Sequence, residues 1–310
     1  MKARSIVVGT ILAVAAFSCR ISTGAPLSDT VQCPLTVLHG RLYLRAALQG
    51  QAQPSWWLVD TGSPWSLVNA DQARELGQSN PGTRGQVTIK GGRTLPVLKG
   101  IGINIAGQAM GSFDFVKYPF LGALDANRNS HVGYERPFHT GGVLGLNFLV
   151  QHQARFDFPA QSLFLTVDSG SSEAGPTRSG AFTAVPIQLT ATPRIEVLGL
   201  VGSRLYSFLI DTGSYRSVID WKIKEANQIP IRPSGILYFG LVDKMVPTAM
   251  GDLQNFKLET LDVSKKFVEF ARLAGSLLGF SHPFGGIIGE DFLWAHQANL
   301  DIGARTLYLK

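Results

Sequence analysis

The amino-acid sequence predicts an all-β protein with a few short helices, built as two similar halves within one chain. Three observations support this prediction. Two blocks of residues recur about 150 positions apart, short β-rich runs broken at turn residues fill both halves, and a Gly/Ser-rich stretch separates them. A length of 310 residues is sufficient for two domains of ordinary size.

The first repeated block is a heptapeptide that ends in Asp-Thr-Gly-Ser. Residues 57–63 read WLVDTGS and residues 208–214 read FLIDTGS, at an offset of 151. The second block has two apolar residues between glycines: residues 142–149 read GVLGLNFL and residues 286–293 read GIIGEDFL, at an offset of 144. The difference of seven residues between the offsets is explained by one loop of different length. The chain is therefore predicted to be an internal duplication.

The repeat also sets the expected domain boundaries. The N-terminal half is predicted over residues 33–166 and the C-terminal half over residues 182–310, with a Gly/Ser-rich flexible linker at 167–181. The linker contains a third triplet of the same kind, Asp-Ser-Gly at 168–170. Here no strand feeds into a downstream helix signal, and no partner glycine block lies at the repeat distance. We therefore interpret it as part of the linker.

The paired blocks resemble the pepsin and retropepsin clan of aspartic peptidases. In that family an apolar-apolar-Asp-Thr/Ser-Gly loop carries a catalytic carboxylate, and a later apolar-apolar-Gly block packs beneath the loop. The resemblance covers both halves and implies a bilobal acid-protease fold made of two tandem retropepsin-like β-barrel halves. It implies that Asp60 and Asp211 form the catalytic pair. Two chance copies of Asp-Thr-Gly-Ser would occur with a probability on the order of 10⁻⁵ at average residue usage.

The resemblance implies hydrolysis of peptide bonds in an extended peptide or protein substrate, without a metal or other cofactor. Two carboxylates held about 3 Å apart cannot both ionise, so they share one proton. The ionised member can take a proton from water while the protonated member donates to the substrate carbonyl. The two groups titrate as a coupled pair, so neither Asp60 nor Asp211 is given a fixed role.

The residues after each aspartate are expected to support the pair. By resemblance, Thr61 and Thr212 form hydrogen bonds to the opposite loop and hold the halves together. Gly62 and Gly213 allow a tight turn and let backbone amides approach the carboxylates.

Two further kinds of residue are expected around each loop. Ser63 and Ser214 are predicted to offer their hydroxyls to the outer carboxylate oxygens. Asn69 and Asp220 have the position and residue type of N-caps for short helices. The helices are expected over residues 70–76 and 221–226.

The family also closes hairpins, called flaps, over its substrate to exclude water. Residues 86–97 place a Gly91-Gly92 turn between β-rich arms, about 25 residues after Asp60. We predict the first flap here, with Gly91 and Gly92 at the substrate. A second flap is predicted over residues 235–248.

Several departures from pepsin-like enzymes narrow the subtype. Trp65 follows Asp60 by five residues rather than seven, the first flap has no tyrosine, and only two cysteines are present. A disulfide framework is therefore excluded. The subtype is predicted to be retropepsin-like and fused in tandem, as in bacterial proteins of the aspartyl protease family, without a pepsin-style zymogen.

The N-terminus is typical of a secretory signal peptide, predicted over residues 1–25. A positively charged start precedes an apolar run at 6–17, which is too short to span a bilayer. Cleavage is expected after Ser18 or Ala25. The alternative is a bacterial lipoprotein signal in which Cys19 carries a lipid anchor. Either way, the protein is expected to be exported, to the periplasm, the cell envelope or the medium.

Composition and charge argue against nucleic acid as a partner. The chain is 45% apolar and 16% charged, as expected for a well-packed globular protein. Three of its 28 basic residues lie in the predicted signal, which leaves 25 basic and 22 acidic residues, a net charge of +3. These residues are scattered along the sequence, whereas a nucleic-acid surface needs clustered basic side chains.

Two histidines, His152 and His296, occupy equivalent positions of the repeat. A duplicated structural residue explains them better than a metal or catalytic pair, because no metal-ligand spacing accompanies them.

Two function classes follow from the sequence. The first is an active endopeptidase, expected as a monomer because one chain supplies both aspartates. The second is a catalytically inactive peptide- or protein-binding module on the same fold. A further arrangement, in which each half pairs with the same half of another chain, also remains open.

Overall fold

The computed structural model describes residues 30–38, 40–79, 84–88, 94–118, 140–167, 182–190, 192–239, 245–273 and 281–310. Within these ranges the protein is nearly all β, with four short helices. The elements of the first half are β1 (Thr30–Pro34), β2 (Thr36–Leu38), β3 (Arg41–Leu48), β4 (Ser55–Val59), β5 (Leu67–Asn69), α1 (Ala70–Ser79), β6 (Arg84–Thr88), β7 (Thr94–Ile105), β8 (Gln108–Tyr118), β9 (Thr140–Leu144), α3 (Leu146–Gln151), β10 (Arg155–Asp157) and β11 (Ser162–Thr166). Those of the second half are β12 (Thr183–Leu189), β13 (Ile195–Val201), β14 (Arg204–Ile210), β15 (Val218–Asp220), α4 (Trp221–Ala226), β16 (Ile231–Phe239), β17 (Met245–Leu253), β18 (Phe256–Leu258), β19 (Leu261–Asp262), β20 (Lys265–Ala271), β21 (Phe284–Ile288), α5 (Glu290–Ala295), β22 (Asn299–Asp301) and β23 (Thr306–Leu309).

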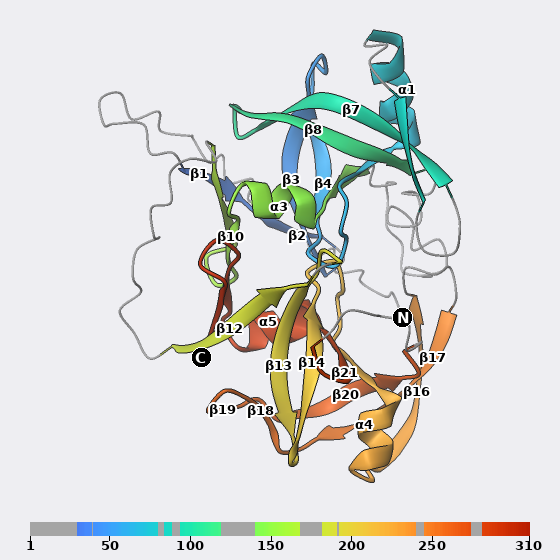
Figure 1. Cartoon of the computed structure of the whole chain (residues 1–310), viewed down its shortest axis with the longest axis vertical. Coiled ribbons are helices and arrows are strands. Elements are labelled where there is room, and N and C mark those ends of the chain that lie inside the picture. Colours follow the sequence, from blue (N-terminus) through green and yellow to red (C-terminus); the bar gives the residue numbers. More distant parts are fainter. Residues whose placement is uncertain are drawn as a thin grey trace, which may run out of the picture.

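The two halves form separate lobes, the first in blue to green and the second in yellow to red (Figure 1). In the described part of the first lobe, eight strands are ordered β2-β3-β4-β9-β5-β8-β7-β6. A further pairing of β3 with β7 curls this sheet back on itself, which gives it a barrel-like form.

The second lobe repeats the same strand order as β13-β14-β21-β15-β20-β17-β16. In both lobes a late strand is inserted between two early ones: β9 runs parallel to β4 and antiparallel to β5, and β21 runs parallel to β14 and antiparallel to β15. These inserted strands contain the repeated glycine blocks. The predicted all-β, bilobal fold of two barrel-like halves is thus confirmed.

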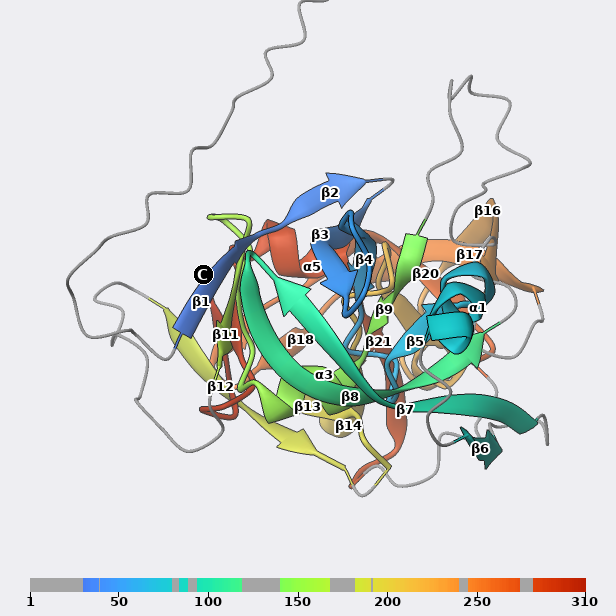
Figure 2. The same cartoon turned by 90° about the horizontal axis from the view of Figure 1, so that it is seen from above.

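A sheet of six strands joins the lobes along one side of the molecule. Its order is β1-β11-β10-β22-β23-β12, with three strands from each half. Strands β1, β11 and β12 of this sheet are seen together on one side of the molecule in Figure 2. The junction is the antiparallel pair β10–β22, where Phe156 lies opposite Leu300. The connection between the lobes is therefore main-chain hydrogen bonding as well as side-chain packing.

The core is rich in aromatic side chains that come from the repeated blocks. Trp57 and Phe148 in the first half, and Phe208 and Phe292 in the second, are buried. The Trp57 ring meets Phe115 edge-on at a centroid distance of 5.6 Å. Cys33 is a buried free thiol whose pKa is raised to about 12 by burial, so it stays protonated and unreactive at physiological pH.

Both predicted helix caps are present. The Asn69 side chain accepts the Asp71 amide at 3.0 Å, and the Asp220 side chain accepts the Lys222 amide at 3.0 Å. Helix α4 has the predicted bounds, whereas α1 continues to Ser79 rather than ending at position 76. Proline follows at position 81, and a proline disfavours helix in the residue before it.

Several predictions fall outside the described residues. These are the signal peptide at 1–25 with Cys19, the linker from residue 168 to 181 with its Asp-Ser-Gly triplet, the turn residues Gly91 and Gly92, and residues 240–244 of the second flap. Among the helices that the structure does describe, none has the length and apolar character to cross a membrane.

Candidate active site

Asp60 and Asp211 occupy equivalent places directly after β4 and β14. The Asp60 amide donates to the carbonyl of Leu144 at 3.0 Å, and the Asp211 amide donates to the carbonyl of Ile288 at 3.0 Å. Each aspartate is thus attached to the end of the parallel strand that contains the glycine block. The duplication places both carboxyl groups by the same backbone geometry.

The two loops bring the carboxyl groups together. A Cβ atom added to Gly62 would lie 2.4 Å from the Asp211 carboxyl carbon, and one added to Gly213 would lie 2.4 Å from that of Asp60. Only glycine lets each loop approach the opposite carboxyl group this closely. The side chains of Asp60 and Asp211 also form a hydrogen bond with each other.

Main-chain amides hold the carboxylates in place. Oδ1 of Asp60 accepts hydrogen bonds from the amides of Gly62 (2.8 Å) and Ser63 (3.1 Å). Oδ1 of Asp211 accepts the amide of Gly213 at 2.9 Å. Because amide donors stabilise the ionised form, they partly offset the effect of burial on the pair.

Both aspartates have pKa values above the ordinary range. For Asp60 the cause is burial, against which the Gly62 amide acts. For Asp211 burial comes first and the negative charge of Asp60 second, which together raise the pKa well above its usual value. A pair with these properties retains a proton at pH values where isolated aspartates have lost theirs.

Thr61 and Thr212 lock the loops to each other beneath the carboxylates. The Thr61 hydroxyl donates to the carbonyl of Ile210 at 2.8 Å and accepts the Thr212 amide at 3.0 Å. The Thr212 hydroxyl donates to the carbonyl of Val59 at 2.8 Å and accepts the Thr61 amide at 3.1 Å. Both side chains are completely buried. The structure thus places the threonines where the resemblance implies.

Ser63 and Ser214 behave differently from the prediction. The Ser63 hydroxyl donates to the carbonyl of Trp65 at 2.7 Å, and the Ser214 hydroxyl donates to that of Arg216 at 2.9 Å. Neither hydroxyl is directed at a carboxylate; only the Ser63 amide reaches Asp60. The predicted hydroxyl role was wrong because the turn brings a carbonyl two residues ahead within reach of each serine.

A second layer of support lies under each loop, and the sequence did not identify it. In the first half, Oδ1 of Asn147 accepts the Ser66 amide (2.7 Å) and the Ser66 hydroxyl (2.8 Å). The Ser66 hydroxyl in turn accepts the Gly145 amide at 3.1 Å. The loop is therefore bonded to the first turn of α3.

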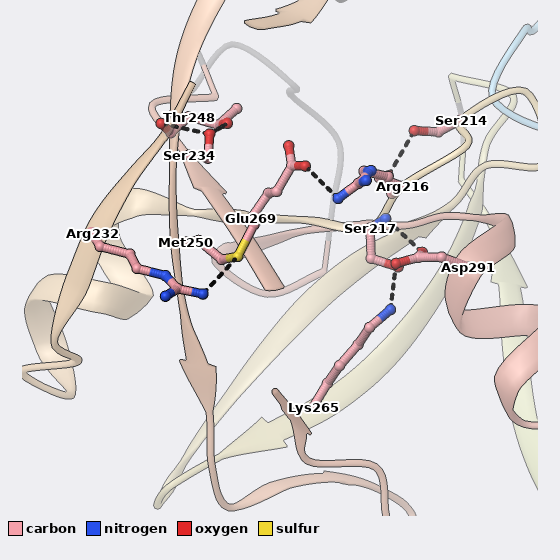
Figure 3. Close-up of polar contacts among 10 residues, drawn as sticks. All are labelled: Ser214, Arg216, Ser217, Arg232, Ser234, Thr248, Met250, Lys265, Glu269 and Asp291. Atoms are coloured by element: carbon pink, nitrogen blue, oxygen red, sulfur yellow. Dashed lines mark hydrogen bonds and ion pairs between the residues drawn. The ribbon is translucent and has the colours of Figure 1, made fainter. Parts of the chain in front are cut away.

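The second half repeats this layer with a charge added. Oδ1 of Asp291 accepts both the amide and the hydroxyl of Ser217 at 2.7 Å, and its other oxygen pairs with Lys265 on β20 (Figure 3). Aligning the repeat at both offsets would have revealed the layer, because Ser66 matches Ser217 and Asn147 matches Asp291.

The residues that follow the loops differ between the halves. Trp65 is 43% exposed, whereas Arg216, at the equivalent position, makes an ion pair of 3.0 Å with the buried Glu269 (Figure 3). Tyr215 is 51% exposed, and its ring lies against Gly40 of the first half. The surroundings of the two aspartates are therefore not symmetric beyond the duplicated core.

In each predicted flap, the two arms pair as the antiparallel strands of a hairpin. Strands β6 and β7 pair antiparallel, with Thr88 opposite Thr94 at the end of the ladder. Strands β16 and β17 pair likewise, with Phe239 opposite Met245. The second hairpin begins at Ile231, four residues before the predicted start.

His152 and His296 join helix ends to the last strand of each half. Nδ1 of His152 lies 2.6 Å from the carbonyl of Thr166, and Nδ1 of His296 lies 3.2 Å from that of Lys310. Burial lowers the pKa of both rings. These contacts favour the structural interpretation, and the described residues contain no cluster of three His, Cys, Asp or Glu suited to a metal ion.

Comparison with known proteins gave similarity to solved structures but no match to a sequence family. No family model and no curated protein matches the chain. Among solved structures, the chain is similar to the crystal structure of basic 7S globulin from soybean, at 12% sequence identity and a TM-score of 0.49. The match covers 91% of this chain and 94% of the globulin.

Proposed function

We propose that this protein is an aspartic endopeptidase of the tandem, retropepsin-like subtype. The observation that carries the proposal is the geometry of the pair: two loops, crossed so that each glycine faces the opposite aspartate, hold Asp60 and Asp211 in hydrogen-bonding contact. The fold alone would support the proposal less, because one fold serves many functions.

The proposed reaction uses a water molecule between the two carboxyl groups. The ionised carboxylate takes a proton from the water, which attacks the scissile carbonyl, while the protonated carboxyl donates to the carbonyl oxygen. The raised pKa values of Asp60 and Asp211 supply the proton that the second role requires. No further cofactor enters this reaction.

The proposal extends to substrate, assembly and location. The substrate is an extended peptide or protein bound between the halves under the β6–β7 and β16–β17 hairpins. The working unit is a monomer, since both aspartates come from one chain. The N-terminal signal directs export to the periplasm, cell envelope or medium, with Cys19 lipidation as the alternative to simple cleavage.

The test is cleavage of an unstructured protein by the exported, processed chain between pH 4 and pH 7. We expect cleavage that a pepstatin-type inhibitor blocks and that Asp60→Asn and Asp211→Asn each reduce by at least about 10³-fold. Circular dichroism of both variants controls for folding. Absence of cleavage at every pH, together with peptide binding that both variants retain, would instead establish the inactive binding module.

A further inference from the structure

Each aspartate continues a row of side chains that crosses one face of its sheet. The amide bonds to Leu144 and Ile288 carry the parallel ladders through Asp60 and Asp211, so each aspartate shares a sheet face with the residue two positions before it. Directly paired residues of neighbouring strands lie on the same face, which extends each row from strand to strand. The first row is Leu58, Val143, Leu67, Val116, Val97 and Gly85. The second row, at the equivalent steps of the ladders, is Leu209, Ile287, Val218, Glu269, Met250 and Arg232.

The two rows differ in charge beyond the residues nearest the aspartates. The first row has Val116 where the second has Glu269, and both side chains are buried. At the outer end, Gly85 of the first row corresponds to Arg232 of the second. Lys99 covers this glycine, because a Cβ added to Gly85 would lie 2.9 Å from Cε of Lys99. A cation is therefore present at the outer end of both rows, and the main difference between them is the buried acid.

This buried acid holds an arginine that follows the aspartate loop. Nη1 of Arg216 lies 3.0 Å from Oε1 of Glu269 (Figure 3), and the Arg216 guanidinium carbon lies 5.6 Å from the centroid of the Tyr215 ring. The Arg216 side chain nevertheless remains 42% exposed. Among the described residues, the guanidinium donates a hydrogen bond to Glu269 alone. A guanidinium carries five N–H groups in a planar fork that suits carboxylates. Arg216 is thus oriented by one carboxylate and retains donors for a second.

The first half shows that the fold does not need an ion pair at this place. Trp65 follows Asp60 by five residues, as Arg216 follows Asp211. It is 43% exposed, and the residue that corresponds to Glu269 is the apolar Val116. The same positions are therefore apolar in one half and ionic in the other.

We propose that Arg216 selects peptides with an acidic side chain on the side of the second half, by binding the carboxylate through the N–H groups that Glu269 leaves free. This inference rests on the proposed binding of an extended peptide between the halves. Such a peptide presents side chains to both halves, and Trp65 with Val116 offers an apolar surface on the other side. The two halves thus recognise different side chains, which fixes the direction in which a peptide binds.

The experiment compares peptides that differ only in charge. An unstructured, end-capped peptide with an apolar centre carries Glu or Gln at each outer position in turn, and kcat/KM is measured for each pair at about pH 6, where a free Glu side chain is ionised. The enzymes are the parent, Glu269→Gln, and the double variant Arg216→Gln with Glu269→Gln, in which no buried charge is left unpaired. Trp65→Gln is the matched control at the equivalent position of the first half.

We expect the parent to prefer Glu over Gln by about tenfold at one position, an effect between that of an exposed ion pair and that of a buried charged hydrogen bond. Glu269→Gln should keep or increase this ratio, because the charge of Arg216 is then no longer offset. The double variant should bring the ratio close to one, whereas Trp65→Gln should leave it as in the parent. A parent ratio close to one at every position, or a preference that the double variant retains, would overturn the proposal.

Binding of the same peptide pairs separates this proposal from the peptidase activity. All proteins in this second measurement carry Asp211→Asn, so that bound peptides stay intact. Cleavage without a preference for Glu would overturn the role of Arg216 and leave the peptidase proposal in place. Absence of cleavage, together with tighter binding of the Glu peptide that the double variant loses, would support the role of Arg216 in an inactive binding module.

Discussion

At the level of single residues, main-chain groups hold the aspartate pair more directly than side chains do. The amides of Gly62, Ser63 and Gly213 bond the carboxylates, whereas the serine hydroxyls bond carbonyls within their own turns. The position of each carboxylate thus depends on the path of the backbone. The glycine in each loop permits that backbone path, because a side chain there would collide with the opposite aspartate.

The first prediction concerns Gly213. In Gly213→Ala the new Cβ would meet the Asp60 carboxyl group and displace it, so we expect kcat/KM to fall by at least about 10²-fold. Ser214→Ala is the matched control in the same loop, because its hydroxyl bonds only the Arg216 carbonyl. This control should change kcat/KM by less than about tenfold. Equal losses in the two variants would contradict the interpretation.

The second prediction concerns the crossed threonines. Thr212→Val keeps the shape of the side chain but leaves the buried Val59 carbonyl and Thr61 amide without partners, which should cost about 2–5 kcal/mol of unfolding free energy. Thr212→Ser keeps the hydroxyl and loses one methyl group, with an expected cost of about 1 kcal/mol. Denaturant unfolding measures both, and a Val variant as stable as the Ser variant would count against the lock.

Much of this residue-level arrangement could be predicted from the repeat. Equivalent positions of a duplication identified Asp60 and Asp211 and the glycines and threonines beside them. The direction of the Ser63 hydroxyl could not be predicted, because it depends on turn dihedrals that a residue type does not fix. Nor could the hydrogen bond that Glu290 accepts from the Leu42 amide, which joins elements from opposite halves and has no counterpart at Leu146, the equivalent residue of the repeat.

At the level of elements, each aspartate loop rests on the helix that follows the inserted strand. Asn147 supports the first loop and Asp291 the second, with the same pair of bonds to Ser66 or Ser217. The glycine before each helix permits this contact, since a Cβ at Gly145 would lie 2.3 Å from the Trp65 carbonyl oxygen.

The third prediction uses this natural pair of supports. Asp291→Asn copies the first half and keeps both bonds to Ser217, so we expect its stability to change by no more than about 1 kcal/mol despite the lost Lys265 ion pair. Asp291→Leu leaves the Ser217 amide and hydroxyl unpaired and should cost about 2–4 kcal/mol. Thermal unfolding of both variants gives the comparison. A larger loss in Asp291→Asn would show that the charge, rather than the bonds, supports the loop.

Element positions were predictable where a local signal exists. The N-caps Asn69 and Asp220 gave the starts of α1 and α4, because capping depends on neighbouring residues only. The insertion of β9 between β4 and β5 could not be read from the sequence alone, since strand pairing is non-local. The end of α1 was missed for a simpler reason: nothing before position 81 forces the helix to stop.

At the level of the whole molecule, both loops of the pair come from one chain, and the bonds between Thr61 and Thr212 are within that chain. The fourth prediction is that the active species has the mass of one chain, which is 33.5 kDa with the predicted signal included. Light scattering on an active fraction measures this.

A complementation experiment provides the control. The Asp60→Asn and Asp211→Asn variants are mixed in the unfolded state and refolded together. The mixture should regain no activity if each active site forms within one chain. Recovery of activity toward a quarter or more of the parent level would show that the first half of one chain pairs with the second half of another.

The junction of β10 with β22 has a consequence for a half produced without its partner. Such a half would leave β10 as an uncovered strand edge, which invites pairing with another copy. In the register seen here Arg155 lies opposite Asp301, and Asp157 lies opposite Asn299. If two first halves met in this register, Arg155 of each would face Asp157 of the other. Two pairs of opposite charges would then form across the new junction. The edge of β10 in this register is thus self-complementary, which is the property that the interface of a symmetric dimer requires.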